Sequence, residues 1–262
     1  MALNEPIAAS APPGEDDSLI VDHVARIVRT LVPAGQPLRH LDVGAGWGHL
    51  IHRLQISHPQ IECQGIDYNP AHFELHGVPI AHGDFNVDRL PYPDASFDLV
   101  TCTEVVEHLE NYRHVLREAF RVTRPGGWLV VSTPNVLSLK SRWVYFIHGF
   151  FVYFDPQPLK DDSRFYPGQR HITPVPFFHL GHALLDAGFS EVTPHCDKSQ
   201  RSSSFWAAVL GPLLRLFAGR VARRRIRHFG PLPESVETLA RLNNSWPVLT
   251  GRTLIVTARR AQ

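Results

Sequence analysis

The sequence predicts an α/β fold with three layers. A seven-stranded, mostly parallel sheet carries helices on both faces, and two insertions lie on the side where a substrate would bind. Short apolar runs typical of buried strands alternate with segments of helical periodicity over most of the first half of the chain. A glycine-rich turn follows the first apolar run. The 262 residues, 44% of them hydrophobic and 19% charged, suffice for one core.

The N-terminal segment, residues 1–17, is expected to be a disordered leader. It is polar and lacks the basic start and apolar block of a signal peptide. Ser18 can then cap a helix that ends near Leu31, because apolar residues recur there at helical spacing. Residues 18–262 are therefore predicted to form one domain.

The first half of that domain alternates strand and helix. Strands are expected at 39–44, at 61–67, in a short run ending at Asp84, at 97–102 and at 128–134. Helices are expected at 48–57 and from Asn111, as a cap, to Val122. This rhythm indicates parallel strand pairing, which places ligands at the carboxyl ends of the strands.

The second half interrupts the rhythm with two insertions, at about 136–170 and 199–250. Between them a helix fits 174–187, closed by Gly188, and a strand fits 189–195. A last strand at 252–259 completes the seven.

Net charge, cysteine content and the length of the apolar runs exclude several classes of protein. The formal net charge is +1, so no global field recruits nucleic acid. The three cysteines have no metal-ligand spacing and favour reduced thiols in a cytoplasmic protein. No window offers 18 uninterrupted apolar residues, so no membrane span is expected.

The turn LDVGAGWGHL follows the first strand. Gly44 and Gly46 allow the backbone to approach a ligand closely at a helix N-terminus. A dinucleotide fingerprint would need a glycine at position 49, where His49 stands. Asp67 ends the second strand and suits two ribose hydroxyls, and Asp84 beside Phe85 suits an adenine amino group and ring.

These motifs resemble the class I S-adenosylmethionine (SAM)-dependent methyltransferases, in particular the type 11, ubiquinone O-methyltransferase-like group, which have a Rossmann-like sheet. LDVGAGWG, GID, GDF, FDLV and RPGGWLVVSTPN carry the likeness. The resemblance implies SAM as cofactor, bound by Asp42, Gly44, Gly46, Asp67, Tyr68, Asp84, Phe85, Thr103 and Glu104. A NAD-type domain, or a SAM-binding scaffold without turnover, remains the alternative.

The stretch TEVVEHLEN crowds three ionisable groups after the fourth strand. In a helical turn, Glu104, Glu107 and His108 would share one face. His108, with Glu107, is a candidate catalytic base for a hydroxyl acceptor. The pattern also resembles the metal site of ubiquinone O-methyltransferases and of small-RNA 3′-terminal 2′-O-methyltransferases. The RNA enzymes add a later histidine, for which His171 is the candidate, and the set Glu104, Glu107, His108 and His171 would suit Mg²⁺ or Mn²⁺. A third interpretation is that these residues only line the pocket.

The insertions suggest the acceptor. Residues 143–154 hold seven aromatics and form a pocket lid, a membrane contact or a small local core. Residues 204–229 combine an apolar stripe with clustered arginines. This pattern suits an interfacial helix on anionic lipid, a phosphate-binding site, or a helix packed on the sheet with a solvated basic end.

The sequence thus predicts a SAM-dependent methyltransferase that modifies an oxygen acceptor. A sugar, a lipid-linked glycan or another amphiphilic hydroxyl compound is preferred, with a cytoplasmic location and possible peripheral contact with the inner membrane face through 204–229. The alternatives are a quinone or other small-molecule O-methyltransferase, and then an RNA 2′-O-methyltransferase, although nucleic acid is an unlikely partner for a chain that is not basic overall.

Overall fold

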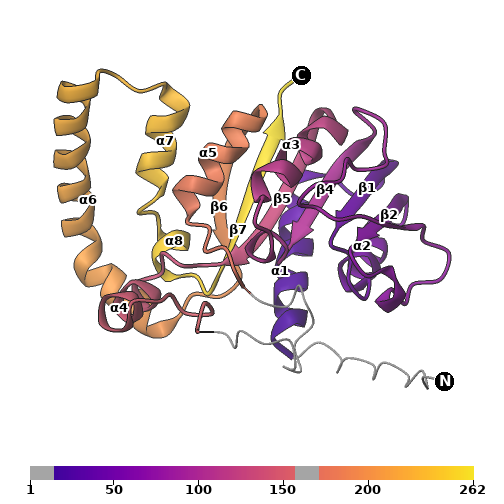
Figure 1. The fold of residues 1–262 in the computed structure, drawn as a ribbon, viewed down its shortest axis with the longest axis horizontal. Coiled ribbons are helices and arrows are strands. Elements are labelled where there is room, and N and C mark those ends of the chain that lie inside the picture. Colours follow the sequence, from indigo (N-terminus) through magenta and orange to yellow (C-terminus); the bar gives the residue numbers. More distant parts are fainter. Residues whose placement is uncertain (1–14, 157–170) are drawn as a thin grey trace, which may run out of the picture.

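A computed structural model describes residues 15–156 and 171–262. It contains one seven-stranded sheet in the order β3-β2-β1-β4-β5-β7-β6, as Figure 1 shows. The strands are β1 (Leu38–Val43), β2 (Ile61–Asp67), β3 (Ile80–His82), β4 (Phe97–Thr103), β5 (Thr123–Pro134), β6 (Phe189–Cys196) and β7 (Thr253–Arg260). β1 to β5 pair in parallel, and β7 runs antiparallel between β5 and β6. The predicted fold class and its seven strands are confirmed.

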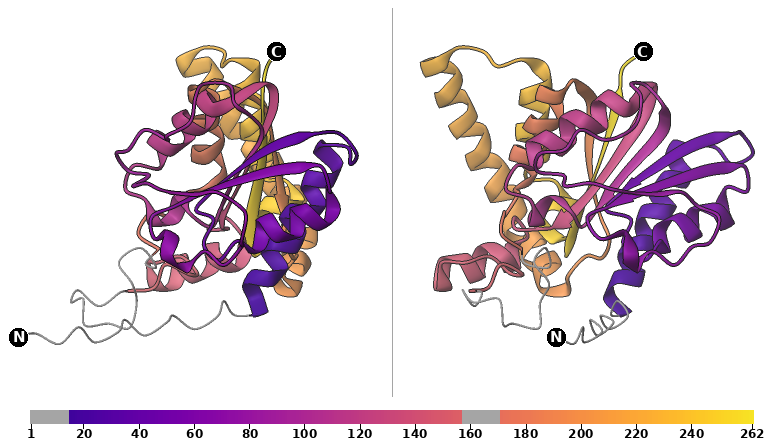
Figure 2. Two further views of the ribbon diagram at one scale, coloured as in Figure 1. Left: turned by 90° about the vertical axis from the view of Figure 1, so that its right-hand side faces the viewer. Right: turned by 45° about the vertical axis from the view of Figure 1, so that its right-hand side comes forward.

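Helices cover both faces of the sheet, which gives the three predicted layers (Figure 2). The helices are α1 (Glu15–Leu31), α2 (His49–Ser57), α3 (Tyr112–Val122), α4 (Leu139–His148), α5 (Phe177–Ala187), α6 (Arg201–Phe229), α7 (Glu234–Leu242) and α8 (Trp246–Thr250), with 3₁₀ turns η1 (Pro70–His72) and η2 (Val106–His108). One apolar cluster joins α1 and α2 to the sheet, and a second joins α3, α5 and α7 to its other face. No described helix is long and apolar enough to cross a bilayer.

Several element boundaries differ from the prediction. Helix α1 begins at Glu15, so Ser18 lies within the helix and the predicted leader is three residues too long; residues 1–14 lie outside the described residues. β3 ends at His82, which leaves Asp84 in the following turn. The first insertion forms α4, its residues 157–170 lying outside the described part, and the second forms α6 to α8.

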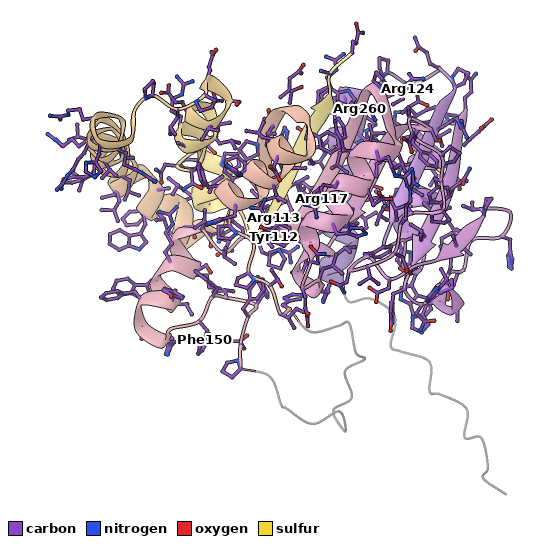
Figure 3. All side chains as sticks on the ribbon, turned by 45° about the horizontal axis from the view of Figure 1, so that its top comes forward. Tyr112, Arg113, Arg117, Arg124, Phe150 and Arg260 are labelled. Atoms are coloured by element: carbon purple, nitrogen blue, oxygen red, sulfur yellow. The ribbon has the colours of Figure 1, made fainter. Side chains whose placement is uncertain are left out.

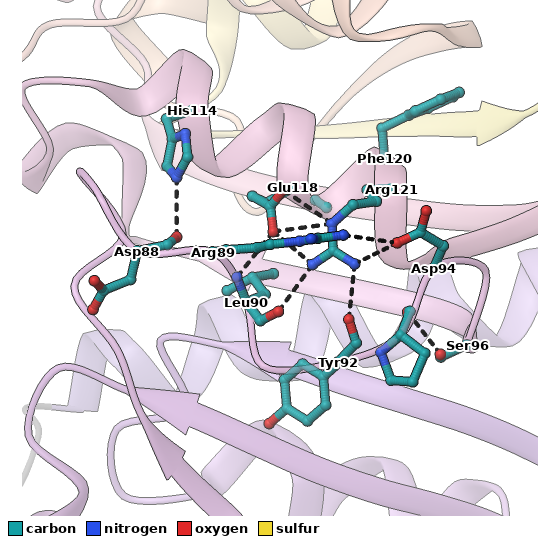
Figure 4. Close-up of polar contacts among 12 residues, drawn as sticks. Asp88, Arg89, Leu90, Tyr92, Asp94, Ser96, His114, Glu118, Phe120 and Arg121 are labelled. Atoms are coloured by element: carbon teal, nitrogen blue, oxygen red, sulfur yellow. Dashed lines mark hydrogen bonds and ion pairs between the residues drawn. The ribbon is translucent and has the colours of Figure 1, made fainter.

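The loop between β3 and β4 is held against α3 by Arg121 (Figure 4). The guanidinium donates to the carbonyls of Leu90 and Tyr92 at 2.9 and 2.8 Å, and it pairs with Glu118 at 2.6 Å. Glu118 in turn accepts from the Leu90 backbone N–H at 2.9 Å. Hydrogen bonds to charged groups are stronger than neutral ones, so this network fixes the loop that begins with Asp84 and Phe85.

The last strand is anchored at the amino end of its neighbours, where Figure 3 labels Arg260. The Arg260 guanidinium donates to the carbonyls of Phe120 and Thr123, each at 2.8 Å, and lies 4.5 Å from the centroid of the Phe120 ring. A planar guanidinium can stack on an aromatic ring while its N–H groups satisfy carbonyls. β7 is thereby tied to the end of α3.

Candidate functional site

Two cavities open at the carboxyl ends of the parallel strands. They have volumes of about 510 and 480 Å³, and Gly44, Gly46, Glu104 and His108 line both. The glycine turn therefore separates two halves of one trough. This is the edge where open parallel sheets bind ligands.

All nine residues proposed from the sequence for the cofactor line this trough. The larger cavity adds Asp42 and Thr103 to the shared residues, and the second adds Asp67, Tyr68, Asp84 and Phe85. Sequence reasoning did not identify the other lining residues. Trp47 and Asn86 directly follow predicted residues, whereas Ile20, Tyr153, Arg252 and Thr253 come from distant segments.

The glycine turn is built for close approach. Gly44 has a φ of +77°, and a Cβ at that position would lie 2.2 Å from the Val105 side chain. Asp67 fixes the turn, because its carboxylate accepts from the backbone N–H of Gly46 at 2.8 Å and of Asn69 at 2.7 Å. A carboxylate offers about four acceptor positions, so Asp67 retains capacity for ligand hydroxyls.

Asp42 ends a buried chain of hydrogen bonds that crosses three strands. The Thr101 hydroxyl donates to Asp42 Oδ1 at 2.6 Å, and His40 Nε2 lies 2.7 Å from the same hydroxyl oxygen. Because Thr101 gives its proton to Asp42, His40 Nε2 must donate, which leaves Nδ1 to accept from the Cys63 thiol at 3.4 Å. Burial lowers the pKa of His40 to about 3, which keeps the imidazole neutral in this chain.

Burial also raises the pKa of Asp42 to about 7, against the opposing effect of the Thr101 hydrogen bond. The folded protein therefore keeps a proton that the unfolded chain loses above pH 3.8, and stability falls as the pH rises between 3.8 and about 7. The Asp42→Asn variant lacks this loss. We expect the free energy of unfolding of this variant, relative to that of the parent protein, to rise by about 2–3 kcal/mol between pH 5 and pH 8, as measured by urea unfolding without cofactor. A difference that does not change with pH would contradict the expectation.

The structure corrects the geometry predicted for TEVVEHLEN. The helical turn is η2, which covers only Val106–His108, and Glu104 precedes it with a φ of +53°. The Glu104 carboxylate instead accepts from the Ser132 hydroxyl at 2.7 Å. The predicted single helical turn over these residues is therefore wrong, although Glu104 still lies near Glu107 and lines the same cavities as His108.

A different trio meets at this place. Donor atoms of Glu107, His108 and His171 all lie within 4.8 Å of one another, while Glu104 is outside the group. The rings of His108 and His171 are 4.9 Å apart between centroids. His171 arrives through backbone pairing, because the Glu107 carbonyl accepts from the N–H groups of Ile172 and Thr173 at 2.9 and 3.0 Å.

The protonation of two members follows from their surroundings. His171 Nδ1 donates to the Tyr153 carbonyl at 2.8 Å, so Nε2 carries the lone pair, and burial lowers the pKa of this imidazole. Glu107 is completely buried. Thr133 and Glu104 lie beside its carboxyl group, but within the described part of the chain neither gives its oxygens a hydrogen bond of regular geometry. Burial first, and then the nearby Glu104, raise the pKa of Glu107 well above its ordinary value.

Known proteins agree with this fold and trough. Residues 18–193 match the family model described as a methyltransferase domain. A demethylmenaquinone methyltransferase of Listeria welshimeri is 35% identical over 131 residues, which are 45% of this chain and 51% of the relative. One from Deinococcus radiodurans is 38% identical over 105 residues, 37% of this chain and 44% of the relative. The chain spans about half the length of these curated relatives.

Solved structures agree on the architecture. A SAM-dependent methyltransferase from Archaeoglobus fulgidus superposes with a TM-score of 0.51 at 19% identity, covering 91% of this chain and 93% of that one. The Haloferax volcanii complex between the Trm112 activator and its putative methyltransferase gives a TM-score of 0.52 at 17% identity, covering 95% and 92%. Sequence identities this low support only the shared fold. The family model, by contrast, matches residues 18–193, which are most of the sequence. The chain therefore belongs to the methyltransferase domain family, and its fold is that of the class I SAM-dependent methyltransferases.

Proposed function

We propose that the protein transfers the methyl group of SAM to a hydroxyl oxygen of an amphiphilic acceptor. The observation that carries the proposal is the trio Glu107, His108 and His171, which stands beside the larger cavity. A hydroxyl must lose its proton to become a good nucleophile, whereas an amine that is already neutral need not. Basic side chains at this position therefore favour oxygen over nitrogen.

In this proposal SAM occupies the trough along the glycine turn. Asp67 faces the ribose, Tyr68, Asp84 and Phe85 the adenosine, and Asp42 with Gly44 and Gly46 the methionine part. Thr103 and Glu104, at the end of β4, border the methyl group. All nine line the trough, and the carboxylates of Asp67 and Asp84 already order the turns that form it.

The acceptor would lie in the larger cavity, beside His108 and His171. Methyl transfer from a sulfonium is an in-line displacement, so most of the catalytic task is to hold the two reactants in line. One of the two imidazoles takes the hydroxyl proton. His171 is suited to this because Nε2 has its lone pair available and the lowered pKa keeps the ring neutral near pH 7.

The trio also fits a divalent cation such as Mg²⁺ or Mn²⁺. A buried carboxyl group without a regular hydrogen bond, together with two imidazoles, is a donor set such cations accept. Glu107, His108 and His171 would hold the ion, which would lower the pKa of the acceptor hydroxyl when bound. Glu104 is not part of this set, because its carboxylate lies outside the group of donor atoms and accepts from Ser132.

Two acceptor classes deserve a direct comparison. The names of the Listeria and Deinococcus relatives favour a quinone-type acceptor, although they do not state which atom receives the methyl group. A lipid-linked sugar is the other amphiphilic hydroxyl acceptor that the sequence suggests.

The deciding experiment offers the purified protein labelled SAM with three acceptors: a demethylated quinone analogue, a lipid-linked sugar and a short RNA. Protein treated with EDTA is compared with protein given Mg²⁺ or Mn²⁺, and calorimetry records SAM binding. We expect a methyl ether on one amphiphilic acceptor. A methyl group on carbon or nitrogen would contradict the oxygen proposal, and SAM binding without turnover on any acceptor would indicate a scaffold. Binding and turnover that do not respond to the ions would remove the cation from the proposal.

A further inference from the structure

Helices α4 and α6 present a large apolar surface to solvent. Trp143 and Phe146 on α4 are 64% and 80% exposed, and Trp206, Val209, Leu213 and Phe217 on α6 are each about half exposed. Figure 1 shows α6 at the outer edge of the molecule beyond α7, with α4 next to its first turns. Soluble monomers rarely leave large apolar side chains clustered in this way. These residues, with the arginines described below, form the α4–α6 surface.

The two helices are joined rather than merely adjacent. The backbone N–H of Lys140 donates to the Ser203 hydroxyl at 3.2 Å. Between the helices lies a cavity of about 530 Å³, lined by the apolar side chains of Leu139, Trp143, Trp206 and Leu210 and by the basic residues Lys140 and Arg142. The surface is therefore concave as well as apolar, with cationic groups at its border.

Basic residues are concentrated in α4 and α6, although the net charge of the whole chain is only +1. Residues 139–148 and 201–229 contain nine Lys and Arg and no Asp or Glu. Since the whole chain has 26 Lys and Arg against 25 Asp and Glu, the remaining residues keep 17 basic groups against all 25 acidic ones. The exposed apolar surface thus coincides with the cationic part of the protein.

Apolar and cationic side chains also follow one line on α6. The steps between successive residues are three or four positions, which is the spacing of one helix face. The line runs through Trp206, Val209, Leu213, Phe217, Arg220, Arg224 and Arg227. The three arginines are exposed. An apolar stripe that continues into arginines on the same face matches a lipid surface, where acyl chains lie next to phosphates and long arginine side chains reach the headgroups.

We propose that the α4–α6 surface docks on an anionic phospholipid bilayer. The charge pattern argues against a second copy of the chain as the occupant, because residues 139–148 and 201–229 contain no acidic side chain that could pair with the arginines of a partner copy. The surface lies close to the trough, since α4 follows β5 at its carboxyl end and Tyr153, five residues after α4, lines the larger cavity. Docking would hold the entrance near the lipid, where an amphiphilic acceptor resides. Bilayer binding itself does not depend on the proposed methyl transfer.

The test is sedimentation with vesicles in the absence of SAM and acceptor. Vesicles of phosphatidylcholine alone are compared with vesicles of equal parts phosphatidylcholine and phosphatidylglycerol, at low and high salt. The parent protein is expected to sediment with the anionic vesicles. Since a basic residue near such a surface contributes about 1 kcal/mol, the triple change Arg220→Gln, Arg224→Gln and Arg227→Gln should weaken binding by about 100-fold at low salt. The double change Trp143→Ser and Phe146→Ser should weaken it at both salt concentrations.

Matched controls separate the surface from charge and hydropathy in general. Arg26→Gln, Arg29→Gln and Arg117→Gln remove three exposed arginines elsewhere, one of them labelled on α3 in Figure 3. Ile56→Ser and Val87→Ser remove two apolar side chains that are 61% and 70% exposed. Both controls should bind as the parent does. Equal loss in the control and surface variants, or no sedimentation of the parent protein, would overturn the proposal. Self-association abolished by Phe146→Ser without vesicle binding would assign the surface to a second copy instead.

Discussion

In the Glu107→Gln variant, we expect methyl transfer to fall by about 10²–10⁴-fold while SAM affinity stays as in the parent protein. The buried Glu107 carboxyl group meets His108 and His171 beside the larger cavity. Glutamine keeps its size but cannot ionise, so it can neither become a carboxylate ligand nor acquire a negative charge when a neighbouring imidazole is protonated. The measurement is kcat with the acceptor that the transfer assay identifies, alongside calorimetric SAM binding.

Two further readings make this result specific. Mn²⁺ titration followed by electron paramagnetic resonance should show binding to the parent protein and loss in Glu107→Gln, without any need for turnover. The matched control is Glu62→Gln, an exposed position on β2, which should keep both properties. Unchanged kcat in Glu107→Gln would show that the trio only lines the pocket.

In the Gly44→Ala variant, we expect SAM affinity to fall by about 100-fold or more. The added Cβ would lie 2.2 Å from Val105 Cγ2, and the φ of +77° is unfavourable for alanine by about 1–2 kcal/mol. Because the Val105 side chain is buried and stiff at χ1, we expect the clash to push the glycine turn and the segment after Glu104 apart. Both line the two halves of the trough, so the ligand would lose contacts on each side of the turn.

Gly77 offers a close match for the backbone strain alone. Its φ is +80°, and a Cβ there would meet nothing within 4 Å. Gly77→Ala should therefore lose only the stability that this strain costs, about 1–2 kcal/mol in urea unfolding, and should leave the calorimetric SAM affinity intact. Parent-like SAM affinity in Gly44→Ala would show that the turn does not contact the cofactor.

The sequence was sufficient for the parts of the site that lie on one strand end each. Asp42, Gly44, Asp67 and Asp84 lie in or just after the last residues of predicted strands, so the strand pattern places them at one edge of a parallel sheet. The same reasoning identified the two insertions, because they interrupt the alternation of strand and helix. The sequence pattern therefore predicts a residue's position when that position depends only on the strand or helix that contains it.

The remaining features depend on contacts between distant segments. Nothing in TEVVEHLEN shows that Ser132, 28 positions later, holds Glu104 or that the backbone of Ile172 pairs with Glu107. The resemblance brought His171 to notice, but its tautomer comes from the Tyr153 carbonyl. Likewise, the cavity between α4 and α6 joins segments about 60 residues apart, which no local periodicity reveals.

The position of β7 has a consequence for the order of events during synthesis. This strand is the last of the seven to leave the ribosome, yet it lies between β5 and β6 and pairs with both along their length. Until residues 253–260 emerge, two strand edges remain without a partner and are open to wrong pairing. Helix α6 emerges before β7, so its apolar and arginine-rich face is available to a lipid surface before the sheet can close. A nascent chain held at a bilayer at that stage would have its unpaired edges separated from other chains.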